Sequence, residues 1–198
     1  MKAAKVCLAL LFAPATVGLV SLTGCGSAPE TETQKVDLAE EGSQSLVELE
    51  RDHPELKTTI DNSYGYAIFP NIAKGGLVVE GGSGRGDVYE QNKYIGTAHL
   101  TLANIGVTIG AETYTELLIF QTKAAEANFE NNALKFDATA SAVALKAGVA
   151  SQPVFTNGVA VITKTLGGLE ADASIGGQQF TFTPAQITPT TVPSAPNP

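Results

Sequence analysis

Short runs of apolar residues separated by glycine dominate this chain from Tyr64 onward. The 198 residues include 20 glycines and no tryptophan. Runs of roughly four to eight apolar residues bounded by turn formers are typical of strands, whereas helices show a longer, 3.6-residue period. The pattern therefore predicts an α+β domain that is mainly antiparallel β-sheet. It leaves open whether the sheet closes into a barrel or stays open.

Two regions of the chain show helical patterns instead. In residues 37–53 three leucines can share one face, and Asp37 with Glu40 has the spacing of a capping box. His53 suits the carboxyl end of that helix, because the helix dipole stabilises a cation there. We therefore expect an N-terminal helical segment, made of helices at residues 37–53 and 55–62, and one further helix at residues 123–132.

The expected strands follow the apolar runs. Residues 82–86 (GSGRG) lie between two runs and are interpreted as a hairpin turn in which Gly82 or Gly84 has positive φ. A phosphate-binding loop is not favoured, because such a loop must open a helix and residues 87–90 have a strand pattern. The hairpin joins residues 77–81 to 87–91; further strands are expected at 66–69 (ended by Pro70), 94–102, 106–112, 116–121, 134–142, 158–164 and 169–182.

The first 25 residues have the organisation of a secretory signal. Two lysines precede an uncharged stretch, residues 6–20, that a proline and a glycine interrupt. This stretch is too short and too broken for a stable spanning helix. Residues 22–25 (LTGC) resemble the lipobox of bacterial lipoproteins, so we expect cleavage before Cys25 and acylation of its sulfur. Because Gly26 follows the cysteine, the periplasmic face of an outer membrane is the expected location.

The expected organisation has four parts. A lipoprotein signal peptide (1–24) is followed by a flexible tether (25–36), a single domain (37–184) and a Pro-rich tail (185–198). Removing the signal takes away Lys2, Lys5 and Cys7, which leaves 10 basic and 20 acidic residues and a net charge of −10. A chain this acidic is repelled by nucleic acid. Without a second cysteine, the mature chain has no disulfide.

Residues that could carry catalysis are sparse. His53 and His99 are far apart in the sequence, and neither has a metal-ligand partner at a useful spacing. No pair of carboxylates has the arrangement of an acid–base couple, and the nucleophile motif Gly-x-Ser-x-Gly is missing. We therefore expect a non-catalytic protein without a metal or a cofactor.

Three blocks of sequence resemble the SYLF domain family. The most specific combines residues 65–70 (GYAIFP), 74–76 (KGG) and 81–86 (GGSGRG). Looser similarity follows in residues 104–110 (NIGVTIG) with 116–120 (ELLIF), and in 167–176 (GGLEADASIG). The resemblance implies a lipid-binding domain and, for a bacterial envelope lipoprotein, a phospholipid partner. Some family members bind actin, which is not expected as a partner in a bacterial envelope. The basic N-terminal helix of the eukaryotic members is replaced here by an acidic segment, which does not favour strong phosphoinositide binding. The alternative is a structural or protein-interaction module whose only membrane contact is its acyl anchor.

Three cations near the first block are the candidate contacts for a lipid head group. In the expected hairpin, Lys74 lies opposite Lys93 at the open end, and two facing lysines are suited to a shared phosphate. Arg85 lies at the turn, roughly 30 Å of strand from Lys74. Lys74 and Lys93 are therefore predicted to form the phosphate contact, with Arg85 as a separate candidate.

Overall fold

The computed structural model describes residues 31–76, 79–105, 108–136, 143–144, 153–165 and 177–186. All of them lie in one compact unit, Thr31–Pro198. The expected signal peptide, Cys25 and most of the Pro-rich tail lie outside the described residues. Within the described ranges, no helix is both long enough and apolar enough to cross a membrane.

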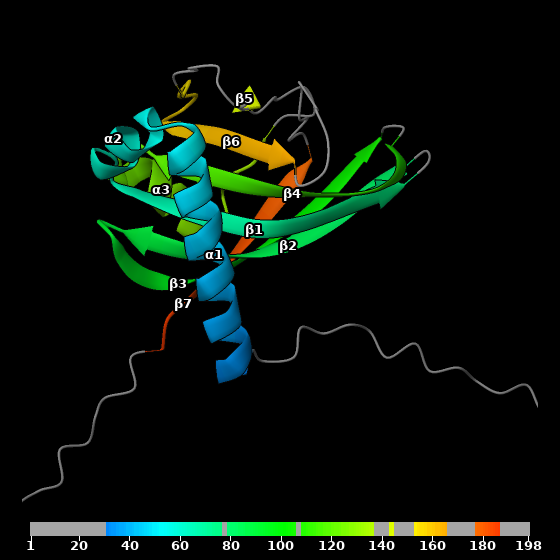
Figure 1. The fold of residues 1–198 in the computed structure, drawn as a ribbon, viewed down its shortest axis with the longest axis horizontal. Coiled ribbons are helices and arrows are strands. Elements are labelled where there is room, and N and C mark those ends of the chain that lie inside the picture. The colour runs from blue at the N-terminus through cyan, green and yellow to red at the C-terminus, as the bar shows by residue number, and fades with distance from the viewer. Residues whose placement is uncertain are drawn as a thin grey trace, which may run out of the picture. The chain divides into compact units, whose positions relative to one another are not determined.

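The fold is α+β and mainly antiparallel, as predicted (Figure 1). The described helices are α1 (Glu32–Asp52), α2 (Glu55–Asp61) and α3 (Lys123–Glu130). The described strands are β1 (Gly65–Gly76), β2 (Val79–Glu90), β3 (Lys93–Ile105), β4 (Thr108–Phe120), β5 (Val143–Ala144), β6 (Val159–Thr165) and β7 (Gln178–Pro184). They form one open sheet in the order β5-β6-β4-β1-β2-β3-β7, in which only the β5–β6 pair is parallel.

Residues 65–70 of β1 and 114–120 of β4 are buried on both faces of the sheet, which explains their unbroken apolar runs. On the outer face, Tyr66 and Ile68 of β1 pack with Leu117 and Ile119 of β4 beneath α1 and α2. On the interior face, the alternate residues pack with Phe129 of α3. This interior cluster includes Ala67, Phe69, Ile72, Val88, Leu100, Leu118, Phe120, Val161 and Phe180.

The connection between β3 and β4 requires the sheet to curl. These strands flank the β2–β1 pair, so a flat sheet would separate them by three strand spacings, about 14 Å. Ile105 and Thr108 are only three residues apart along the chain, which limits their separation to about 11 Å. The pairs Val79↔Ile105 and Gly76↔Thr108 accordingly bring all four strand ends together. β7 then passes across the interior face, as Figure 1 shows, and its Phe180 ring lies 5.8 Å from that of Phe69.

The glycine-rich segment is not a turn, so the expected hairpin is wrong. Residues 82–86 lie inside the continuous strand β2, and neither Gly82 nor Gly84 has positive φ. Gly82, Gly84 and Gly86 instead face the interior, where β2 curls tightly against β1. A Cβ on Gly84 would lie 2.6 Å from Ile72 Cγ1, and one on Gly86 would lie 2.7 Å from Phe69 Cδ1. The sequence pattern does not separate the two roles, because a close approach between strands and a turn both favour glycine.

The hairpin turn near this segment lies at Gln91 and Asn92, between β2 and β3. Both residues have positive φ (47° and 64°), which is typical of a two-residue type I′ turn. This turn places Lys93 opposite Glu90. Expected strands 66–69 and 94–102 belong to the longer strands β1 and β3, 106–112 and 116–121 merge into β4, and 158–164 is confirmed as β6. Residues 134–136 of the expected strand 134–142 form only an isolated bridge at Lys135, and the described strand within 169–182 begins at Gln178. Residues 137–142 and 169–176 lie outside the described residues.

The first helix begins five residues earlier than expected. Thr31, not Asp37, is the N-cap, and it forms a capping box with Gln34. The buried Gly42 lies where α1 crosses the sheet, and a Cβ added to it would lie 3.4 Å from Ile68 Cγ2. His53 does close the helix, as predicted. The expected tether of residues 25–36 is therefore wrong at its end, because residues from Glu32 onward are helical.

Candidate functional site

The structure does not bring Lys74 and Lys93 together. Lys74 pairs with Gly82 on β2, whereas Lys93 pairs with Glu90, eight residues or roughly 27 Å further along the same strand. The prediction of a shared phosphate site is therefore wrong, because it depended on the turn at residues 82–86. The two lysines lie at opposite ends of the curled sheet.

The two remaining candidates have different surroundings. Arg85 is exposed on the outer face of β2, in register with Asn71 of β1 and His99 of β3. Lys93 is exposed beside the β2–β3 turn. Arg85 and Lys93 are both accessible to a head group, and each would contact it separately.

Lys74 instead lies in a polar cluster on the interior face, which we call the interior polar cluster: Lys74, Glu112, Tyr114, Glu116 and Gln178. The Lys74 ammonium, 11% exposed as a side chain, lies 3.0 Å from Glu112 Oε2 and 5.3 Å from the centre of the Tyr114 ring. Its charge is therefore balanced within the protein, and an external phosphate would have to compete with a carboxylate and an aromatic face.

Glu116 and Gln178 form the fully enclosed end of this cluster. Gln178 Nε2 donates to Glu116 Oε2 at 2.8 Å and to the Tyr114 hydroxyl at 3.3 Å. Glu116 is 0% exposed and Gln178 is 1% exposed. Burial raises the pKa of Glu116 to about 8, against the opposing effects of the Gln178 bond and the Lys74 charge. Glu116 therefore keeps its proton at neutral pH.

Sequence reasoning missed this pair. Gln178 and Glu116 are 62 residues apart and come from strands on opposite sides of β1, β2 and β3 in the sheet. One local signal existed, because Glu116 opens the apolar run 116–120, whose residues are buried on both faces. A carboxylate in such a run must find an internal partner or stay protonated.

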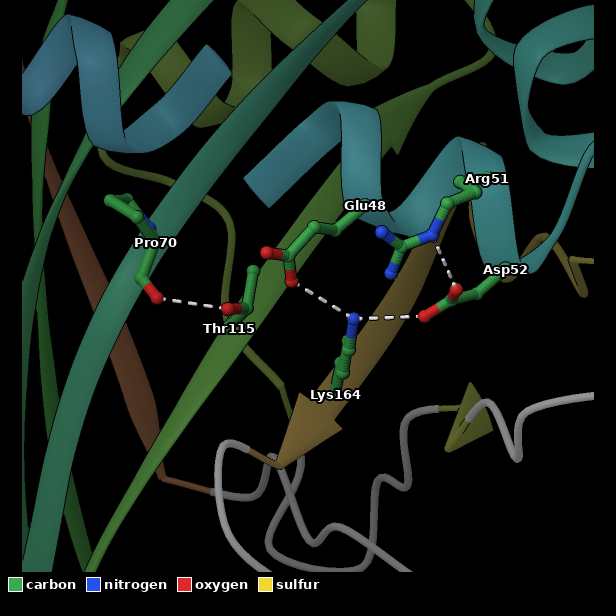
Figure 2. A network of polar contacts seen from close by, with 6 residues as sticks. All are labelled: Glu48, Arg51, Asp52, Pro70, Thr115 and Lys164. Carbon is green, nitrogen blue, oxygen red and sulfur yellow. Dashed lines mark hydrogen bonds and ion pairs between the residues drawn. The ribbon is translucent and has the colours of Figure 1, made fainter. Parts of the chain in front are cut away.

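On the outer face, a second polar network joins α1 to the sheet (Figure 2). Lys164 of β6 lies 2.9 Å from Asp52 Oδ2 and 3.2 Å from Glu48 Oε2, both on α1. The bond from Lys164, followed by that from Arg51, lowers the pKa of Asp52. These residues are partly exposed, so the network fixes the position of α1 more than it stabilises the fold.

β1 continues past Pro70, whose contact with Thr115 is drawn in Figure 2. The register of β1 shifts between Phe69 and Ile72, where Pro70 has no N–H for the ladder. The Thr115 hydroxyl donates to the Pro70 carbonyl at 2.9 Å. The strand therefore bends at a bulge rather than ending there, which corrects the prediction that Pro70 terminates it.

A third polar group lies at the opposite end of the sheet from Lys74. The Tyr64 hydroxyl donates to Glu90, and the buried Glu126 of α3 lies against the Gly65 backbone. Burial, with the nearby charges of Glu90 and Glu130, raises the pKa of Glu126 to about 7. Among the described residues, no three His, Cys, Asp or Glu side chains are arranged to hold a metal ion.

Of the three predicted head-group contacts, Lys74 thus belongs to the interior polar cluster, whereas Arg85 and Lys93 are exposed and lie apart from each other. Comparison of the chain with protein-family models found no match, and a search among curated proteins found none either.

Proposed function

We propose that this protein is a membrane-anchored envelope lipoprotein whose SYLF-like domain binds phospholipid without catalysing a reaction. The observation that supports it best is the start of α1. Only six residues separate Cys25 from Glu32, so an acylated Cys25 would hold the first turn of the domain within about 25 Å of its anchor. A domain tethered this closely meets lipid head groups at a high effective concentration.

Weak head-group contacts suffice under these conditions. The mature charge of −10 repels an anionic surface as a whole, so the contact depends on local cations. Arg85 and Lys93 are the exposed candidates near the first SYLF-like block, and they replace the Lys74–Lys93 pair expected from the sequence. Lys74 is held inside the sheet by Glu112.

The alternative is a structural or protein-interaction module without a lipid site beyond the anchor. One observation favours it: in the part of the chain that the structure describes, the exposed large apolar side chains are dispersed. They are Val36, Val47, Tyr94 and Val154. Insertion into a bilayer would require a contiguous apolar patch.

Cys25→Ser tests the anchor. We expect this variant to lack acyl mass on its N-terminus and to leave the membrane fraction, because each buried methylene contributes about 0.8 kcal/mol to anchoring. Intact-mass analysis and membrane fractionation measure the two effects. A variant that partitions into membranes as the parent does would show that Cys25 is not the anchor.

Charge reversal tests the head-group contact. In protein produced without residues 1–25, Arg85→Glu with Lys93→Glu should weaken co-sedimentation with phosphatidylglycerol vesicles several-fold at low salt. The matched control is Lys57→Glu with Lys123→Glu, which changes the net charge equally at exposed lysines on α2 and α3. The difference should fade at high salt because exposed charges are screened. Equal losses in both double variants would exclude a local site at Arg85 and Lys93.

A further inference from the structure

The side-chain amide of Gln178 joins β7 to the far wall of the curled sheet through its bonds to Glu116 and Tyr114. β7 bonds along its length to β3, and three strands separate it from β4 in the sheet. Its side chains nevertheless reach β4 across the interior, where Gln178 Nε2 donates to Glu116 Oε2. Phe180, two residues along β7, packs on the rings of Phe69 and Phe129. β7 thus covers the interior cluster, and Gln178 is at its first residue.

The donors and acceptors in this contact do not balance when Glu116 is ionised. Glu116 Oε1 and Gln178 Oε1 are both buried and have no hydrogen-bond partner among the described residues. An ionised Glu116 offers only acceptors, so two acceptor oxygens would stay unsatisfied in the interior. A proton on Glu116 turns one of its oxygens into a donor. That donor matches Gln178 Oε1, the acceptor that otherwise has no partner among the described residues.

The nearby charge of Lys74 lowers the pKa of Glu116, but burial raises that pKa by more. The interior side chains of the surrounding strands decide which charges Glu116 meets. Titratable neighbours are Lys74 on β1, with Glu112 and Tyr114 on β4. Lys74 forms an ion pair with Glu112 at 3.0 Å, which places a negative charge beside the ammonium. The described interior residues of the other strands are not titratable: Gly82, Gly84, Gly86 and Val88 on β2, Ala98, Leu100 and Leu102 on β3, Val159, Val161 and Thr163 on β6, and Gln178, Phe180 and Phe182 on β7.

We propose that Glu116 makes the attachment of β7 pH-dependent: its neutral acid holds Gln178 across the interior, and loss of its proton to solvent weakens that hold. Ionisation would leave one uncompensated negative charge in an enclosed apolar space. The charge is relieved when β7 separates from β4 and water reaches the carboxylate. Separation of β7 would expose Phe180 and the interior cluster beneath it. This inference does not depend on the proposed lipid binding.

The sign of the effect follows from linkage. Burial raises the pKa of Glu116 from 4.5 to about 8 in the closed state, and the ordinary value applies when β7 is open. Between pH 4.5 and about 8 the closed state therefore binds more protons than the open state. The proton stabilises the closed state fully at low pH, and this stabilisation is lost as the pH rises to about 8. Opening of β7 should increase about tenfold per pH unit between them and level off above pH 8.

Amide hydrogen exchange of the full mature protein tests this proposal, with exchange rates corrected for their intrinsic pH dependence. For the β7 amides, the opening equilibrium of the wild type should rise about tenfold per pH unit from pH 5 to 8. Glu116→Gln keeps the shape and supplies an amide donor, so it should remove the slope. Glu48→Gln, at a half-exposed carboxylate that bonds Lys164 on the outer face, is the control and should keep the slope.

Three outcomes of the exchange experiment would overturn the proposal. The first is a wild-type β7 whose protection does not change with pH. The second is a slope that survives Glu116→Gln. The third is an equal slope for the central amides of β1 and β4, because Glu116 would then control global unfolding rather than β7. Carbon-13 titration of the Glu116 carboxyl is independent of the variants: titration near 8 supports the proposal, and titration near 4.5 overturns it.

Discussion

Phe129→Ala is expected to lower the free energy of unfolding by about 3–5 kcal/mol, the largest effect of any single substitution considered. Phe129 is fully buried and connects α3 to both walls of the interior. Its ring lies 5.0 Å from that of Phe120 on β4 and 5.4 Å from that of Phe180 on β7. Truncation removes these ring contacts and leaves a cavity that the curled sheet cannot easily close.

Urea denaturation followed by circular dichroism measures this loss. Val154→Ala is the control, because this side chain is 66% exposed and its truncation should change the stability by less than about 0.5 kcal/mol. A loss below about 1 kcal/mol for Phe129→Ala would mean that α3 does not pack into the interior as described.

Gly86→Ala should destabilise the protein by about 2–3 kcal/mol although it adds a single methyl group. That methyl would lie 2.5 Å from the Ile68 carbonyl oxygen and 2.7 Å from Phe69 Cδ1, and neither neighbour is the free end of a flexible side chain. The strands must separate, which flattens the curl on which the interior depends. Thermal and urea unfolding both report the loss.

Gly81→Ala is the matched control for this prediction. It lies five residues earlier on β2, is exposed, and has no atom within 4 Å of an added Cβ. Alanine in place of a strand glycine should leave the stability unchanged or raise it by up to about 1 kcal/mol. If both substitutions have equal effects, the interior position of Gly86 is not what requires glycine.

The class of fold could be predicted from the sequence because it depends on local patterns. Apolar runs in residues 66–69 and 116–121 indicated strands, and the leucine spacing in residues 37–53 indicated α1. The curl could not be predicted, since it follows from a short β3–β4 connection around two other strands. That topology also decides where the cations lie, so the shared Lys74–Lys93 site was wrong once the turn moved to Gln91 and Asn92.

The interior polar cluster was missed for the same reason. Glu116 and Gln178 are neighbours only because β7 crosses the interior face, and no periodicity within either strand encodes that crossing. The start of α1 is a different case. Thr31 and Gln34 carry a capping-box pattern as clear as that of Asp37 and Glu40, and the choice between them needs the tertiary packing of the helix.

The central claim is that the domain itself contacts phospholipid, and flotation of anchor-free protein tests it most directly. Protein produced without residues 1–25 is mixed at low salt with vesicles of phosphatidylcholine, with or without phosphatidylglycerol, and centrifuged through a density gradient. The proposed function predicts that protein rises with the vesicles and that the anionic lipid increases this fraction. Folded wild-type protein that stays at the bottom with both kinds of vesicle would contradict it and leave the acyl group on Cys25 as the proposed membrane contact.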